Sequence, residues 1–216
     1  MKKTLMIALA GLMMFAFTPC GGKDENGKEK TVQGTVEFKD AMKVLDDYEK
    51  AIGNAKSCED LKKAKKDFRE AANKLDDKEY GDKEKLTPEE KDKLTIKQAE
   101  IKVKERKKCR QYKCDGCKMD WENNDRKGSD QVSKEYKDVS KAFDECEKAI
   151  SKAKSCDDLK NVELKIDYKK EYSDKEKMTP EEEDKLIIRN AELTVKENKK
   201  CREFQCDWCK GDWEKK

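Results

Sequence analysis

The sequence predicts an all-α protein made of two tandem three-helix repeats, each stapled by disulfides. Three observations lead to this fold class: an internal duplication, apolar residues that recur every three or four positions, and four cysteines at matching places in each copy. The chain has 216 residues, of which 47% are charged and 34% hydrophobic. Because so little apolar surface is available for burial, a bundle of this composition needs covalent support against its conformational entropy.

Two blocks of sequence occur twice. AKSCEDL at 55–61 returns as AKSCDDL at 153–159, and EYGDKEKLTPEE at 79–90 returns as EYSDKEKMTPEE at 171–182. The offset between the copies is 98 residues in the first block and 92 in the second. The second copy therefore lacks six residues near position 170.

The duplication sets the domain boundaries. We place helical repeat 1 at 36–122 and helical repeat 2 at 132–216, joined by a polar linker at 123–131. Residues 20–35 are rich in glycine and charge and are expected to form a flexible tether. The residues before them, 1–19, read as a signal peptide.

The first helix of each repeat is predicted by apolar residues at helical spacing. They are Phe38, Ala41, Leu45, Tyr48, Ile52 and Ala55 in repeat 1, and Tyr136, Val139, Phe143, Cys146, Ile150 and Ala153 in repeat 2. The second helix begins at a capping pair, Ser57 with Asp60, which repeat 2 matches with Ser155 and Asp158. Its apolar face in repeat 1 comprises Leu61, Ala64, Phe68, Ala72 and Leu75.

The third helix has the clearest start. Thr87-Pro88-Glu89-Glu90 places threonine at the cap, proline in the first turn and glutamate at the third position, and Thr179–Glu182 repeats this pattern. Beyond the cap, Ile96, Ala99 and Val103 share one helix face, whereas Leu94 and Ile101 lie nearly opposite. We expect a central helix covered on both sides. Docking of the second face onto the neighbouring repeat or a partner, and a strand over LTIKQAEIKVK, are alternatives.

The first twenty residues, MKKTLMIALAGLMMFAFTPC, differ from the rest of the chain. Lys2 and Lys3 precede an apolar run from Leu5 to Phe17, which is the pattern of an export signal. A cysteine placed directly after such a run, here Cys20, resembles the lipidation site of bacterial lipoproteins. That resemblance implies a diacylated Cys20 at the mature N-terminus and a membrane partner through the lipid. An ordinary signal peptide cleaved nearby is the alternative.

Lys23-Asp24-Glu25 follows this cysteine. The triplet resembles the Lys-acidic-acidic signal that sends some Bacteroidota-type lipoproteins to the cell surface. The resemblance implies a location in the bacterial cell envelope, anchored to the outer membrane by the lipid and exposed on the surface. In a chain this rich in charge, an ordinary charged triplet is the alternative.

Eight cysteines form two matching sets of four, and one further cysteine, Cys146, has no counterpart. The sets are Cys58, Cys109, Cys114 and Cys117 in repeat 1, and Cys156, Cys201, Cys206 and Cys209 in repeat 2. The Cys-x4-Cys-x2-Cys run resembles that of plant-type iron–sulfur proteins. Its fourth cysteine, however, lies some fifty residues before the run rather than after it, so we do not predict a cluster. A four-thiolate zinc site and a thioredoxin-like exchange site at the C-x-x-C pairs are further alternatives.

Structural disulfides are the preferred interpretation, because thiols outside the cytoplasm tend to oxidise. Four cysteines allow three connectivities. Cys58–Cys109 with Cys114–Cys117 is one, and Cys58–Cys114 with Cys109–Cys117 is another. A bridge that closes a loop of about fifty residues is worth roughly 4 kcal/mol in the chain-entropy model. Cys146 occupies a predicted core position and is expected to be a buried free thiol, with an intermolecular bridge or a reactive thiol as alternatives.

The composition also limits the chemistry. The chain contains no histidine, which excludes histidine-based triads, the HExxH zinc motif and histidine-ligated haem. Charges of both signs alternate closely, so no basic stripe for nucleic acid is present. Trp121, Trp208 and Trp213 are candidate binding aromatics for a protein or glycan ligand, or caps over the disulfides. We expect a non-catalytic binding protein without metal or cofactor; an envelope thiol-disulfide or metal-binding protein is the alternative.

Overall fold

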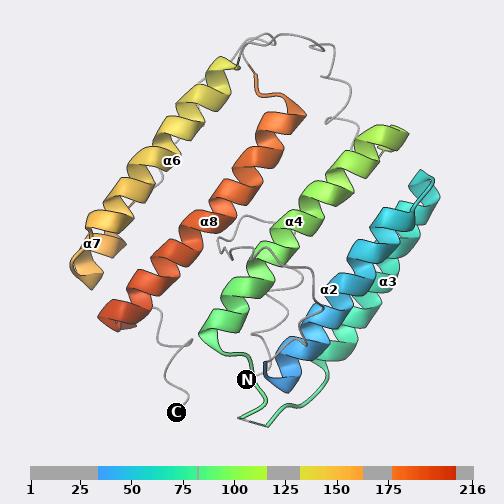
Figure 1. The fold of residues 1–216 in the computed structure, drawn as a ribbon, viewed down its shortest axis with the longest axis horizontal. Helices are drawn as coiled ribbons and strands as arrows, with labels where there is room; N and C mark the ends of the chain where they lie inside the picture. The colour runs from blue at the N-terminus through green and yellow to red at the C-terminus, as the bar shows by residue number, and fades with distance from the viewer. Residues whose placement is uncertain (1–33, 82, 116–131, 163–176, 208–216) are drawn as a thin grey trace, which may run out of the picture.

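All of the regular structure described in the protein is helical. The computed structural model describes residues 34–81, 83–115, 132–162 and 177–207. Six helices lie in these ranges: α2 (Val36–Asn54), α3 (Cys58–Asp76), α4 (Pro88–Tyr112), α6 (Lys134–Lys152), α7 (Cys156–Lys160) and α8 (Pro180–Phe204). They form two packed groups, one for each repeat, so the predicted fold class is confirmed (Figure 1).

The helices begin at the predicted capping residues. The Ser57 hydroxyl accepts a hydrogen bond from the Asp60 N–H at 3.1 Å at the start of α3. Thr87 and Glu90 form a complete capping box, in which each side chain accepts from the backbone of the other. These contacts satisfy N–H groups that the first helical turn leaves without an intrahelical partner. The second repeat makes the same contacts at its own capping residues.

The segment from Pro88 to Tyr112 is one continuous α-helix, so the strand alternative is wrong. The helix ends at Lys113, whose backbone is left-handed with φ 53°. The N–H groups of Lys113 and Cys114 donate to the carbonyls of Arg110 and Cys109, which is a Schellman motif. Gln205 ends α8 in the same way, with φ 55°.

The second helix of repeat 2 differs from the prediction. Helix α7 ends at Lys160 after five residues, whereas its counterpart α3 is 19 residues long. Both the backbone N–H and the side-chain amide of Asn161 donate to the carbonyl of Asp157. Such side-chain competition for backbone groups makes asparagine a weak residue for helix continuation. The residues that follow, 163–176, lie outside the described ranges.

Each repeat has its own apolar core. All six predicted positions of the first helix in repeat 1 are buried, as are four of the five predicted positions of α3. In repeat 2 the core contains Phe143, Cys146, Ile150, Ala153 and Leu159, with Tyr136 and Val139 partly buried beside it. The third helices complete these cores through one of their apolar faces, with Leu94 and Ile101 from α4 and Leu186 and Leu193 from α8.

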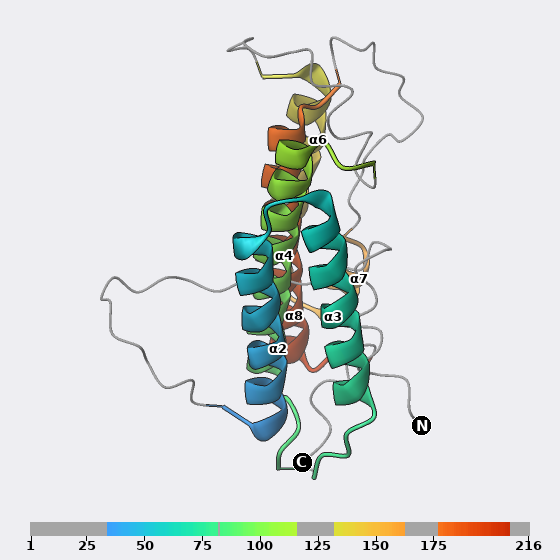
Figure 2. The same cartoon turned by 90° about the vertical axis from the view of Figure 1, so that its right-hand side faces the viewer.

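The two third helices lie side by side at the centre of the molecule (Figure 1). Their second apolar faces meet in a third cluster, in which Ile96 and Ala99 of α4 pack with Ala191, Ile187 and Ile188 of α8. The structure therefore bears out the alternative in which the second face of this helix docks on the neighbouring repeat, and this repeat provides the second cover. Turning the molecule by 90° shows α2 and α3 side by side on its outer edge, with α4 behind them (Figure 2). Within the described ranges, none of the helices is both long enough and apolar enough to span a membrane.

Candidate functional site

The disulfides lie where the second and third helices of each repeat come together. Cys58 opens α3 and is bonded to Cys114, which follows the end of α4; their Cα atoms are 5.4 Å apart. Cys156 and Cys206 form the same bridge in repeat 2, also with a Cα distance of 5.4 Å. Cys114 is 5% exposed, so the bridge is shielded from solvent.

This bridge selects one of the two connectivities named from sequence, Cys58–Cys114 with Cys109–Cys117. Cys109 and Cys201 are disulfide-bonded as well. In this connectivity their partners are Cys117 and Cys209, which lie outside the described residues. Cys114 is bonded to Cys58 rather than to its neighbour in the C-x-x-C motif, which differs from the pairing that a thioredoxin-like site uses.

Hydrogen bonds reinforce the same end of repeat 1. The Tyr112 hydroxyl donates to the carbonyl of Ala55 at 2.7 Å, linking the end of α4 to the junction between α2 and α3. The hydroxyl is absent from repeat 2, where Phe204 occupies the equivalent position. The bridged end is therefore the more tightly joined in repeat 1.

Cys146 is a buried free thiol in α6. Burial raises the pKa of this thiol, and the carboxylates of Glu197 and Glu147 raise it further. Because the thiolate is the reactive form of cysteine, this environment suppresses nucleophilic chemistry. Cys146 replaces Tyr48 of repeat 1, whose hydroxyl donates to Glu105 at 2.9 Å.

The buried charged side chains have structural partners. Glu90 accepts from the backbone N–H groups of Thr35 and Thr87 at 2.7 Å and 2.8 Å, so one carboxylate joins the N-termini of α2 and α4. Burial opposes its ionisation, but these hydrogen bonds outweigh that effect and hold the pKa of Glu90 below its usual value. Glu182 links Ser133 and Thr179 in the same way in repeat 2.

Two further buried carboxylates lie between the repeats. Asp184 of α8 accepts from Arg110 of α4, and Asp92 of α4 accepts from Arg202 of α8, each at 2.5 Å. Arg106 adds a second guanidinium to Asp184 at 3.1 Å. Burial raises the pKa of Asp92 in spite of the opposing effect of Arg202.

We call the surface that each repeat presents to the other its inter-repeat face. The face of repeat 1 comprises Asp92, Ile96, Ala99 and Arg110 on α4, and the face of repeat 2 comprises Asp184, Ile188, Ala191 and Arg202 on α8. The apolar members on α4 were identified from the sequence, but all four charged ones were missed. The signal available for them was their retention at the same position in both copies, at the offset of 92 residues.

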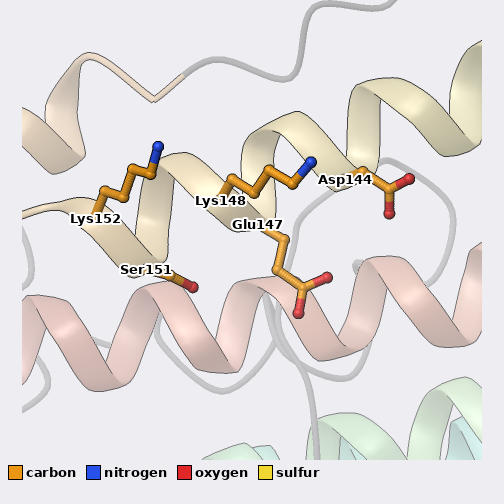
Figure 3. A pocket seen from close by; sticks show the side chains of 5 residues that line it. All are labelled: Asp144, Glu147, Lys148, Ser151 and Lys152. Atoms are coloured by element: carbon orange, nitrogen blue, oxygen red, sulfur yellow. The ribbon is translucent and has the colours of Figure 1, made fainter.

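A shallow depression of about 300 Å³ lies along α6 (Figure 3). Its lining residues are Asp144, Glu147, Lys148, Ser151 and Lys152, all from one helix. Figure 3 shows Glu147 pointing toward α8, where it pairs with Lys196 and Arg189, while the two lysines point away from α8. The depression has mixed charge and no nucleophile with an adjacent base, so it offers no catalytic arrangement.

The described part of the chain contains no group of three or more cysteine or carboxylate side chains that could hold a metal ion. Four of the zinc ligands considered from sequence are instead bonded in the Cys58–Cys114 and Cys156–Cys206 bridges. Trp121, Trp208 and Trp213, together with the lipidation residue Cys20, lie outside the described residues. No known protein family, curated protein or solved structure matches the chain.

Proposed function

We propose that this protein is an exported, lipid-anchored protein of the bacterial cell envelope with a non-catalytic binding role. The leader and Cys20 support export and anchoring, and the Lys-Asp-Glu triplet after Cys20 supports exposure at the surface. The disulfides support a compartment outside the cytoplasm, because such bridges form and persist in oxidising surroundings.

One observation carries the non-catalytic part of the proposal: the four fully buried carboxylates of the described residues serve the fold. Glu90 and Glu182 join helix N-termini, and Asp92 and Asp184 bind guanidinium groups between the repeats. A catalytic carboxylate needs access to substrate and a pKa suited to proton transfer. The buried carboxylates here are closed off by neutral donors or by arginine.

The duplication supports binding of a protein or glycan ligand. Two similar units on one chain can engage two sites at once, which raises avidity without a new contact. The tryptophans Trp121, Trp208 and Trp213 are the side chains that we propose as contacts, because aromatic residues dominate the energetics of such interfaces. The close alternation of charge supports neither nucleic acid nor a basic membrane-binding surface beyond the lipid.

Intact mass measurement of the exported protein tests the anchor and the bridges together. Free thiols are alkylated first, and the mass is compared before and after reduction. The proposal expects a chain that starts at an acylated Cys20, with eight cysteines bridged and Cys146 alkylated after unfolding. A Cys20→Ala variant, which is expected to lose the acyl mass and leave the membrane fraction, is the matched control. Free or metal-bound thiols in place of the bridges would favour the thiol-disulfide or metal-binding alternative.

Binding is tested on arrays of envelope glycans and peptides with the purified protein. Substitution of Trp121 or Trp213 by alanine should weaken capture about tenfold each, and the double variant should lose the avidity of two sites, about a hundredfold or more. Unchanged capture by the double variant would remove the tryptophans from the proposal.

A further inference from the structure

Within one chain, the inter-repeat face of repeat 1 pairs with the equivalent face of repeat 2. Arg110 of repeat 1 binds Asp184 of repeat 2, and the counterparts of these residues, Arg202 and Asp92, bind each other. Each pair is obtained from the other by exchanging the repeats, and α4 and α8 run antiparallel (Figure 1). A surface whose contacts are exchanged in this way is two-fold related, which is the arrangement found at the interface of a symmetric homodimer.

The apolar centre follows the same relation. Ala99 and Ala191 are equivalent residues at the offset of 92, and both are buried in the cluster between the helices. Ile96 and Ile188, which flank them, are also equivalent and identical. Ile187 is the exception in this cluster, because Thr95 stands at its equivalent position in repeat 1; the other residues named here that make the face complementary to its neighbour are present on both repeats.

A face that complements the other repeat at these positions also complements a second copy of itself. We infer that the inter-repeat face is a self-recognition surface, and that the same face of a second copy of this chain can occupy it in place of the neighbouring repeat. In that exchange, repeat 1 pairs with repeat 1 and repeat 2 with repeat 2. This self-recognition rests on the described helices and does not depend on the lipid anchor or on a ligand.

Differences at two charged positions also break the symmetry, and they favour the closed single chain. Arg106 binds Glu183 in the pairing of repeat 1 with repeat 2. The counterparts of these residues are Asn198 and Lys91. Pairing repeat 1 with itself places Arg106 beside lysine, and pairing repeat 2 with itself places Glu183 beside a neutral amide. Only the pairing of repeat 1 with repeat 2, which we call the mixed pairing, gains the Arg106–Glu183 ion pair.

Covalent linkage favours the closed chain as well, because a short linker holds the second repeat at an effective concentration on the order of millimolar. The wild-type protein is therefore expected to be a monomer in dilute solution. Charge substitutions that weaken only the mixed pairing should therefore cause two chains to associate through like faces.

The double variant Asp184→Arg/Arg202→Asp applies that penalty. Within one chain it places the new arginine against Arg110 and Arg106, and the new aspartate against Asp92. In a pair of repeat 2 faces, by contrast, the arginine introduced in one chain meets the aspartate introduced in the other. A pair of repeat 1 faces keeps its wild-type charges. Light scattering of the full mature chain at micromolar concentration should show association to about twice the wild-type mass or more.

The quadruple variant, with Asp92→Arg and Arg110→Asp added, is the matched control. The two arginine–aspartate pairs of the mixed pairing then form again in reversed orientation, with only Arg106 left beside the arginine that replaces Asp184, and the mass should return to that of a monomer. A double variant that stays monomeric while its helical circular dichroism is retained would overturn the inference. Equal association of the double and quadruple variants would overturn it too, because charge complementarity would then not govern the contact.

A second measurement covers the case in which the double variant does not fold. Ala99→Cys in the otherwise wild-type chain places a thiol at the centre of the face, and Lys107→Cys places one on the exposed side of the same helix. In a glutathione redox buffer at millimolar protein, the Ala99→Cys variant should give roughly tenfold more disulfide-linked dimer than the Lys107→Cys variant, despite the burial of its thiol. Less dimer from Ala99→Cys than from Lys107→Cys would overturn the inference.

Discussion

The guanidinium of Arg110 lies 2.5 Å from the carboxylate of Asp184 and joins the last turns of α4 to the first turns of α8 across 74 residues of sequence. Both side chains are buried, at 8% and 5% exposure. A buried ion pair adds little over an apolar pair of the same shape, but removal of one partner leaves the other charge buried and uncompensated. Substitutions that remove only one partner of such a pair are therefore expected to lower the free energy of unfolding most.

Arg202→Ala should destabilise the protein more than Arg110→Ala. Asp92 pairs with the guanidinium of Arg202 and otherwise keeps only the neutral Asn198 amide as a hydrogen-bond donor, whereas Asp184 keeps the charged Arg106 when Arg110 is removed. We expect losses of about 3 kcal/mol and about 2 kcal/mol in the free energy of unfolding. Urea unfolding followed by circular dichroism measures both, and a reversed order would contradict the role given to Arg106.

Replacement of Cys58 and Cys114 together by alanine should lower the free energy of unfolding by about 4 kcal/mol. The bridge closes a loop with a sequence separation of 56 residues, and opening that loop returns entropy to the unfolded chain. Thermal unfolding under non-reducing conditions measures the loss. The matched pair Cys156 and Cys206, with a separation of 50, should show a similar loss. A change below about 1 kcal/mol in either would contradict the staple.

Acid should weaken the wild-type protein more steeply than Glu90→Gln. The pKa of Glu90 is held below its ordinary value of 4.5 in the folded state. The stabilisation that this shift represents is present above pH 4.5 and is lost as the pH falls through the lowered pKa. Glutamine cannot be protonated in this range, so the variant lacks this contribution. Unfolding curves from pH 6 to pH 2 compare the two, and parallel acid limbs would argue against the prediction.

Lys113→Gly should stabilise the protein by about 0.5 kcal/mol. A left-handed backbone costs an ordinary residue roughly 1–2 kcal/mol, whereas glycine adopts it without that penalty but loses more entropy on folding. Gln205→Gly is the matched substitution at the end of α8 and should act in the same direction. Differential scanning calorimetry provides the measurement; a lower transition temperature for both would show that the side chains contribute more than the strain.

Cys146 should react slowly with thiol reagents in the folded protein. Burial raises its pKa, so at pH 8 the thiolate is scarcer than for an exposed cysteine. Labelling by a disulfide reagent should be roughly a hundredfold faster in denaturant than under native conditions. Comparable rates in the two conditions would show that repeat 2 opens readily around this position.

Local sequence patterns predicted most of the helices. The three-four spacing of α2 and the Thr87-Pro88-Glu89-Glu90 start of α4 depend on residues that are neighbours along the chain, so they are visible without knowledge of the fold. The early end of α7 was not visible, because the effect of Asn161 depends on the balance between its own hydrogen bonds and packing from elsewhere.

The partners of the charged residues were beyond prediction from sequence. In a chain with 47% charged residues, retention in both copies separates Arg110 from Arg106 but not from Lys108, and it does not name a partner. The choice is made by the crossing of α4 and α8, which determines the side chains that face each other. The disulfide connectivity had the same difficulty, because it depends on how the left-handed turn at Lys113 places Cys114 beside the start of α3.

The two-fold relation of the inter-repeat face has a consequence for how such a chain can change over generations. In a dimer of identical single repeats, one codon substitution alters two contacts simultaneously. Once the repeats are fused, Arg106 and Asn198 are encoded separately, as are Lys91 and Glu183. Each of these positions can then vary alone. In a dimer of identical subunits, an ion pair like Arg106–Glu183 requires both of its residues on every subunit, whereas in the fused chain each repeat carries only one of them. Fusion of the repeats in one gene thus allows a sequence to encode a preference of repeat 1 for repeat 2 over a second repeat 1.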